Sequence, residues 1–199
     1  MIPIPQDIIV AGVDEAGRGP LAGPVVAAAV ILNRDRRIEG LDDSKRLTAK
    51  KRKAFFNLIM ERAISVGVGI VDNGEIDDIN ILNATLKAMR IAVNKLSIIP
   101  DIIYVDGNQA IPDVDIKQKA IIKGDTLETP IMAASIIAKV TRDEIMIAYA
   151  EKYRNYGFER HKGYGTPQHL KALRDYGPTP IHRRSFSPVE NILATKGNG

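Results

Sequence analysis

Two adjacent carboxylates, Asp14 and Glu15, follow an apolar run near the start of the chain, and the segment Gly17–Arg18–Gly19 comes directly after them. A charged pair in this position either binds a cation or lies on a solvated loop. Glycine lets a backbone approach a bound group closely, and the planar guanidinium of arginine suits phosphate. The carboxylates could bind a metal ion, and the arginine and the exposed glycine amides could bind phosphate. This combination indicates phosphodiester chemistry.

Two further acids end apolar runs in the same way: Asp106 precedes a glycine, and Asp125 follows one. Taken alone, each acid is more often a turn or capping residue than a metal ligand. If the runs at 8–14 and 101–106 are parallel neighbours, Asp14 and Asp106 lie side by side at the sheet edge where open α/β sheets bind ligands. The pattern therefore predicts a cluster of acids at strand ends.

Carboxylates gathered in this way require a counter-charge. Close, unpaired carboxylates repel one another, and at least one of them would take up a proton. A divalent cation removes that penalty, and oxygen ligands in a chain with 0 cysteines favour Mg²⁺ or Mn²⁺ over zinc. Two such ions about 4 Å apart can activate a water and stabilise a leaving 3′ oxygen.

The composition suits one substantial domain. The chain has 199 residues, of which 45% are hydrophobic, and no apolar run reaches the roughly 20 residues that a membrane helix needs. We expect a cytoplasmic protein, because a signal-like N-terminus and cysteines are both missing from the sequence. The net charge of +4 is a mild lean towards polyanions.

Strands and helices alternate along the predicted chain. Runs rich in valine and isoleucine predict strands at 8–14, 24–32, 65–71, 101–106 and 116–123. Apolar residues at helical spacing predict helices after a cap at Thr48, at 78–96, at 129–152 with Thr129 as the N-cap, and at 167–175 after Thr166. This order predicts a mixed α/β sheet that is antiparallel at one side and parallel at the other.

Six short motifs follow one another at workable spacing. They are V-D-E-A-G-R-G-P-L-A-G-P at 13–24, L-D-D-S-K-R-L at 41–47, Y-V-D-G-N at 104–108, K-G-D at 123–125, A-A-S-I-I-A-K-V-T-R-D at 133–143 and H-K-G-Y-G-T at 161–166. Any one of them is a weak signal, but the ordered set is specific. Over roughly residues 8–190 the chain resembles ribonuclease HII of the bacterial type.

The resemblance implies a ribonuclease-H-like fold, in which a mixed five-stranded sheet is flanked by helices. It implies a catalytic domain over 1–160 and a helical or loop extension over 161–199 that packs on the same domain. The reaction it implies is endonucleolytic hydrolysis of the RNA strand of RNA–DNA hybrids. It further implies nicking on the 5′ side of a ribonucleotide embedded in duplex DNA, leaving 5′-phosphate and 3′-hydroxyl ends.

The same resemblance assigns roles to individual residues. The four acids Asp14, Glu15, Asp106 and Asp125 match the ligands of two divalent cations, Mn²⁺ or Mg²⁺, with Asp14 bridging both ions. Glu15 would coordinate one ion through its backbone carbonyl as well as its side chain. Gly17, Arg18 and Gly19 match the segment that grips the ribonucleotide and its phosphate, and Tyr164 the tyrosine that packs on the following deoxyribose. The remaining candidate substrate contacts are Ser44, Lys45, Arg46 and Lys139.

The resemblance also separates this chain from a related type. Ribonuclease HIII carries a glutamate at the position of Asp125 and an additional N-terminal domain, whereas here about seven residues precede the first strand. The tail at 195–199 has no aromatic residue of the kind that sliding-clamp motifs carry, so no clamp motif is predicted. We expect a monomer whose partner is nucleic acid and not a membrane.

Several residues have simpler interpretations. The spacings of His161, His169 and His182 match no zinc pattern, and we predict no catalytic histidine, although His161 could contact phosphate. Arg142 and Asp143 predict an ion pair between a helix and the core.

Three other functions stay open at this point. A junction resolvase on the same fold would cleave a four-way junction, and an RNA–DNA hybrid-binding module would not need the four acids. A small-molecule phosphatase is a weaker third candidate, because the surface is basic.

Overall fold

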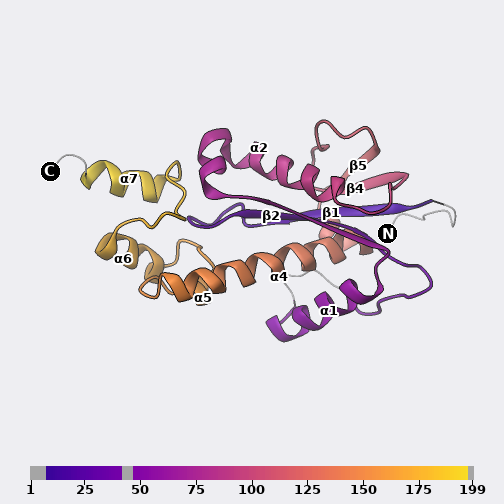
Figure 1. Cartoon of the computed structure of the whole chain (residues 1–199), viewed down its shortest axis with the longest axis horizontal. Helices are drawn as coiled ribbons and strands as arrows, with labels where there is room; N and C mark the ends of the chain where they lie inside the picture. The colour runs from indigo at the N-terminus through magenta and orange to yellow at the C-terminus, as the bar shows by residue number, and fades with distance from the viewer. Residues whose placement is uncertain (1–7, 42–46, 197–199) are drawn as a thin grey trace.

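The computed structural model describes residues 8–41 and 47–196. Within them the chain forms five strands and seven helices, which Figure 1 shows in order. The strands are β1 (Val10–Ala16), β2 (Val25–Ile31), β3 (Ser65–Val71), β4 (Ile102–Asp106) and β5 (Lys117–Ile121). The helices are α1 (Ala49–Arg62), α2 (Asn73–Asn94), α3 (Gly124–Leu127), α4 (Thr129–Lys152), α5 (Phe158–His161), α6 (Pro167–Tyr176) and α7 (Ser187–Lys196).

The five strands make one sheet in the order β3-β2-β1-β4-β5. β2 pairs antiparallel with both β1 and β3, whereas β4 pairs parallel with both β1 and β5. The predicted mixed sheet, antiparallel at one side and parallel at the other, is confirmed. In the parallel pair Val13 lies opposite Val105, so the next residue of each strand, Asp14 and Asp106, emerges at the same level.

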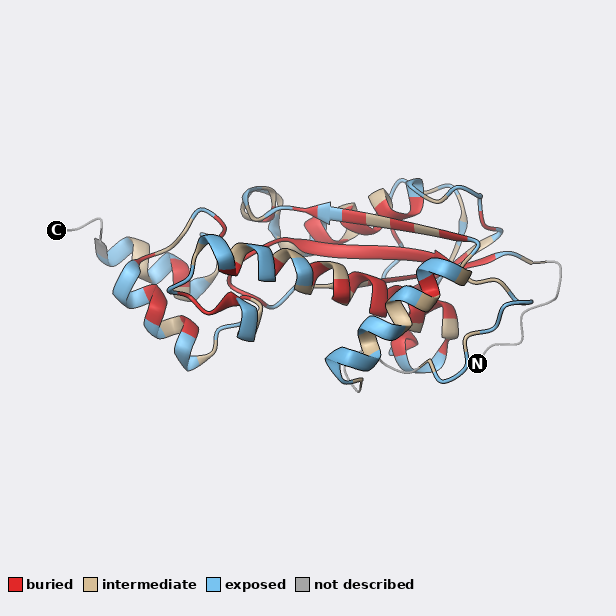
Figure 2. Cartoon of the chain, turned by 60° about the horizontal axis from the view of Figure 1, so that its bottom comes forward, coloured by how far each residue is buried: buried red, intermediate tan, exposed pale blue. Residues whose placement is uncertain are grey.

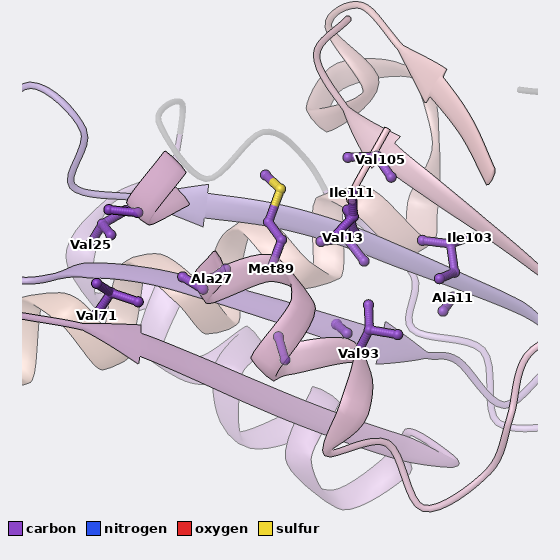
Figure 3. Packing of buried hydrophobic residues seen from close by; sticks show 14 of the residues in the cluster. Ala11, Val13, Val25, Ala27, Val71, Met89, Val93, Ile103, Val105 and Ile111 are labelled. Atoms are coloured by element: carbon purple, nitrogen blue, oxygen red, sulfur yellow. The ribbon is translucent and has the colours of Figure 1, made fainter. Parts of the chain in front are cut away.

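Helices cover both faces of the sheet. α2 packs on one face, where Val13, Val25 and Met89 belong to one apolar cluster (Figure 3). α1 and α4 cover the other face around Val30 and Ile137. β2 is buried along its whole length and lies between these layers, as the continuous red strand in Figure 2 shows.

The start of α4 lies directly against β1. A Cβ atom at Gly12 would lie 2.1 Å from the carbonyl carbon of Pro130, so only glycine permits this approach. The close packing places the N-terminal end of α4 beside the strand that carries Asp14.

The bounds of several elements differ from the sequence-based prediction by a few residues. α2 begins at Asn73, not at 78, because the Asp72 side chain accepts a hydrogen bond from Glu75 N–H and caps it. Asn80 interrupts this helix with a φ of 65°, and its side chain accepts from two later amides. The N-cap of α4 is Glu128 and not Thr129.

The fifth strand also ends earlier than predicted, at Ile121. Asp125 consequently lies on the short helix α3 and not at a strand end. The left-handed backbone at Lys123, with a φ of 59°, makes the turn between β5 and α3.

The last part of the chain packs beside the end of α4. Thr166 caps α6 as predicted, because its hydroxyl accepts from His169 N–H. α7 was not predicted, and its Val189 packs with Leu21 and Leu173. Within 8–41 and 47–196, no helix is long and apolar enough to cross a membrane. The division at residue 160 remains a prediction.

Candidate active site

Three aspartates converge at the ends of neighbouring elements. Asp14 lies near the end of β1, Asp106 ends β4, and Asp125 is the second residue of α3. One carboxylate oxygen from each lies within 4.8 Å of the other two. The Asp125 amide donates a 3.3 Å hydrogen bond to Asp106 Oδ1, which ties the short helix to the strand end. The structure therefore brings together three of the four acids that the sequence singled out.

The environment of Asp14 disfavours its ionised form. Burial raises the pKa of this carboxyl well above its usual value, and the negative charges of Glu15, Asp106 and Asp125 raise it further. A 2.7 Å hydrogen bond from the Glu15 amide to Asp14 Oδ1 acts in the opposite direction. An additional positive charge at this point would remove the penalty.

The donor set fits a hard divalent cation. All three groups offer carboxylate oxygens, and Asp14 and Asp125 are each only 5% exposed. Mg²⁺ and Mn²⁺ prefer such oxygen ligands, and buried acids without a cation or a hydrogen-bond donor are unfavourable. Asp14, Asp106 and Asp125 could hold such an ion.

Glu15 lies on the other face of β1. Along a strand, successive side chains point to opposite faces, and Glu15 pairs with Ala27 whereas Asp14 pairs with Ala28. The Glu15 carboxylate lies 3.5 Å from the Arg18 guanidinium. Both residues line a cleft of about 240 Å³, together with Asp106. Glu15 is thus not among the three acids whose oxygens lie within 4.8 Å of one another, but it shares a cleft with Asp106, and its charge raises the pKa of Asp14.

The segment Gly17–Gly19 and Tyr164 come together although they are far apart in the sequence. The position of a Cβ at Gly19 would be 3.7 Å from the Tyr164 ring, an ordinary contact distance. Gly17 has a φ of 102°, which strongly favours glycine. Arg18 and Tyr164 are both about half exposed, at 52% and 45%. Both side chains are therefore accessible to a ligand from solvent.

Two buried arginines lie under this surface. The predicted ion pair of Arg142 with the core is wrong: its guanidinium donates to the backbone carbonyls of Ala22, Pro24 and Lys162, at 3.0–3.1 Å. Arg183 donates in the same way to the carbonyls of Gly17, Arg18 and Gly23. Arg183 was not predicted as a buried residue, because the basic run at 182–184 is typical of a solvent-exposed segment.

Two buried histidines, His169 and His182, form a hydrogen-bonded chain that ends at the backbone carbonyl of Tyr164. Thr179 N–H donates to His182 Nδ1, so in neutral His182 the proton is on Nε2, which lies 3.0 Å from His169 Nε2. His169 then carries its proton on Nδ1 and donates to the Tyr164 carbonyl, at 2.9 Å. Burial is the main cause that lowers the pKa of both rings to about 4. His161 accepts from Gly163 N–H.

The other candidate contacts have different positions. Lys139 Nζ lies 2.7 Å from Asp143, which also lies 3.8 Å from Arg52 of α1. Lys139 thus belongs to a charged group between α1 and α4. Ser44, Lys45 and Arg46 lie outside the described residues.

Comparisons with known proteins agree with one another. The family model described as "Ribonuclease HII" matches residues 11–189. A ribonuclease HII from Acetivibrio thermocellus is 58% identical over 179 residues, which are 90% of this chain and 70% of that protein.

Solved structures show the same fold. The crystal structure of the ribonuclease H2 from Pyrococcus horikoshii OT3 has a TM-score of 0.79 and 31% identity, covering 96% of this chain and 100% of that one. An Archaeoglobus fulgidus structure, of a PCNA:RNase HII complex, has a TM-score of 0.77 and 26% identity and covers 90% and 95%. The chain therefore belongs to the ribonuclease HII family, the endoribonucleases that degrade RNA in RNA–DNA hybrids.

Proposed function

We propose that this endoribonuclease depends on two divalent cations, Mn²⁺ or Mg²⁺, and nicks duplex DNA on the 5′ side of an embedded ribonucleotide. The products would carry 5′-phosphate and 3′-hydroxyl ends. The observation that carries the proposal is the convergence of three carboxylate oxygens within 4.8 Å of one another, two of them from the buried Asp14 and Asp125, next to a cleft that Glu15 and Arg18 line.

In this proposal the acids hold the cations. The charges of Glu15, Asp106 and Asp125 all act on Asp14, so Asp14 would serve as the ligand that both cations share. Glu15 lines a cleft together with Asp106, and it would coordinate one ion through its backbone carbonyl as well as its side chain. When bound, the cations would activate a water and stabilise the leaving 3′ oxygen. The protein supplies the position and the buried surroundings.

The neighbouring surface would read the sugars. Backbone groups at Gly17 and Gly19 can approach a 2′-hydroxyl that a side chain would block, and this hydroxyl distinguishes RNA from DNA. Tyr164 lies against Gly19, so its ring can pack on the next sugar and be crowded by an added hydroxyl. Arg18, half exposed, can contact the phosphate between them.

The predicted domain organisation gives both parts of the chain a task. Residues 1–160 would carry the acids and the segment Gly17–Gly19, and the extension over 161–199 would supply Tyr164. The cluster that Leu21 forms with Leu173 and Val189 supports the proposal that this extension packs on the same domain.

The test is cleavage of a DNA duplex that contains one ribonucleotide, with Mn²⁺, Mg²⁺ or EDTA, followed by mapping of both ends. We expect metal-dependent nicking on the 5′ side, with no cleavage of an all-DNA duplex or a four-way junction. Cleavage of a long RNA–DNA hybrid alone would contradict the junction specificity but leave the metal site. Equal cleavage in EDTA would contradict the metal mechanism.

A further inference from the structure

Two buried arginines form hydrogen bonds to the backbone of the proposed substrate-binding surface, which consists of the segment Gly17–Gly19 and Tyr164. Arg142, on α4, and Arg183, after α6, are 1% and 0% exposed. Arg183 Nη1 and Nη2 donate to the carbonyls of Arg18 and Gly17, at 2.8 and 2.5 Å, and Nε donates to Gly23 at 3.0 Å. One planar group thus ties both ends of the loop at 17–24.

Arg142 connects this loop to the tyrosine segment. Its Nε and Nη2 donate to Pro24 and Ala22, and Nη1 donates to Lys162, two residues before Tyr164. Arg142 Nε also occupies the space beside Gly17, where a Cβ would lie only 2.1 Å away. The relative position of the two segments therefore depends on this side chain.

The inward carbonyls determine where the amides point. In a trans peptide the C=O and the N–H of the same plane point in opposite directions. The Gly17 and Arg18 carbonyls face Arg183, so the next amides, Arg18 N–H and Gly19 N–H, face away from it. In the described part of the chain these two amides donate no hydrogen bond. Successive outward amides form a concavity that suits an anion.

The positive charges of the guanidiniums are not cancelled locally. Within 8–41 and 47–196, neither forms an ion pair with a carboxylate, and Asp77 and Asp143 act on them only from a distance. Burial, and then the charge of Arg142, lower the pKa of Arg183 to about 9, which leaves the group charged at neutral pH. The Phe186 ring lies 5.0 Å from this guanidinium. A cation that binds the carbonyl of a peptide also strengthens its N–H as a donor.

We infer that Arg183 and Arg142 are positioning residues for substrate recognition: they turn the Arg18 and Gly19 amides outward and fix them relative to Tyr164. This inference rests on the proposed function of that surface. It predicts a requirement for the guanidinium fork itself, because the single ammonium of lysine cannot reach three separate carbonyls in one plane.

The test compares Arg183→Lys with the wild-type enzyme on a duplex carrying one ribonucleotide and on a long RNA–DNA hybrid. We expect KM for the first substrate to rise about tenfold or more, and the preference for it over the hybrid to fall. Mn²⁺ affinity, measured by calorimetry, should stay within about twofold, since the arginine contacts none of the acids. Arg142→Lys should show the same pattern through the loss of its Lys162 contact, and it carries the test if Arg183→Lys does not fold.

Two controls distinguish positioning from stability. Val189→Ala removes packing next to Leu21 and leaves both guanidiniums in place, and Arg174→Lys makes the same chemical change on the exposed face of α6. Both should keep the wild-type KM and preference. Folded Arg183→Lys and Arg142→Lys enzymes with the wild-type KM and preference would overturn the inference. A wild-type enzyme that does not prefer the single ribonucleotide would instead overturn the proposed function.

Discussion

The acid cluster and the arginine pair both bury like charges, but they stabilise them differently. Arg142 and Arg183 direct six hydrogen bonds to backbone carbonyls, so the protein itself satisfies both guanidiniums. Asp14 lies among other acids, and its pKa is raised by burial and by their charges. Dipoles of the fold suffice for a delocalised guanidinium, whereas a cluster of carboxylates requires a cation.

The arginine pair is therefore a structural element of the fold, whereas the acid cluster is a site for ions that bind from solution. The arginine side should be formed in the protein before anything binds. The carboxylates of the acid cluster should repel one another until divalent cations bind, and the relief of this repulsion favours cation binding.

The largest expected effect comes from removing a central acid. Asp14→Asn should lower the rate of hybrid cleavage about 10³-fold or more, because the metal contribution to the transition state is worth several kcal/mol. The same change removes a buried charge, so the melting temperature in EDTA should stay equal or rise. Asp113→Asn, on the exposed surface, is the matched control and should change neither quantity. Substantial Mg²⁺-dependent cleavage by folded Asp14→Asn enzyme would contradict the role of this acid.

Acid should next weaken the histidine support behind Tyr164. The folded pKa of His169 and His182 is about 4, below the unfolded value of 6.5, so the unfolded state takes up protons first as the pH falls. Stability from the neutral pair is complete above about pH 6.5 and decreases until about pH 4, by about 3 kcal/mol for one proton. Urea unfolding across this range measures it. A His182→Gln variant with an unchanged pH slope would show that the cluster is not its source.

Metal binding should stabilise the acid side by a comparable amount. Mn²⁺ at about 100 times its Kd should add about 2.7 kcal/mol to the free energy of unfolding of the wild-type protein. Asp14→Asn should show little of this gain, whereas Arg183→Lys should keep it. Calorimetric melting with and without Mn²⁺ measures both. Equal stabilisation of all three proteins would place the bound metal elsewhere.

The smallest of these effects concerns the sugar-reading side chain. Tyr164→Ala should reduce the preference for a single embedded ribonucleotide about tenfold and leave cleavage of a long hybrid within about twofold, because the ring packs on one sugar only. Tyr176→Ala removes another exposed tyrosine and is the control. If Tyr164→Ala slows both substrates equally, the tyrosine does not read the sugar.

Sequence reasoning identified the acids because their signal is local. An apolar run that ends in a carboxylate predicts a buried strand with an acid at its carboxyl end. The parallel pairing of β1 with β4 then places Asp14 next to Asp106. The mixed sheet followed from the order of strands and helices for the same reason. Asp125 also joins the cluster, although it does so from the short helix α3 and not from a strand end.

The supporting side chains could not be predicted in the same way. The carbonyls that bind Arg142 and Arg183 are backbone atoms up to 166 residues away, and no residue type marks them. A sequence therefore favours a carboxylate partner for Arg142, which the fold does not supply. Asn80 shows the same limit on a smaller scale, since apolar periodicity continues across the break in α2.

The most direct test of the division between the two regions is the binding of Asp14→Asn enzyme to two duplexes, one all-DNA and one with a single ribonucleotide, by fluorescence anisotropy in Mg²⁺. This variant should lose cleavage, but it keeps the segment Gly17–Gly19, Tyr164 and both arginines. We predict that it still binds the ribonucleotide duplex several-fold more tightly. Two results together would contradict the account: Asp14→Asn binds both duplexes with equal affinity, and the wild-type enzyme, with cleavage slowed in Ca²⁺, binds the ribonucleotide duplex more tightly. The sugar would then be read through the acid cluster.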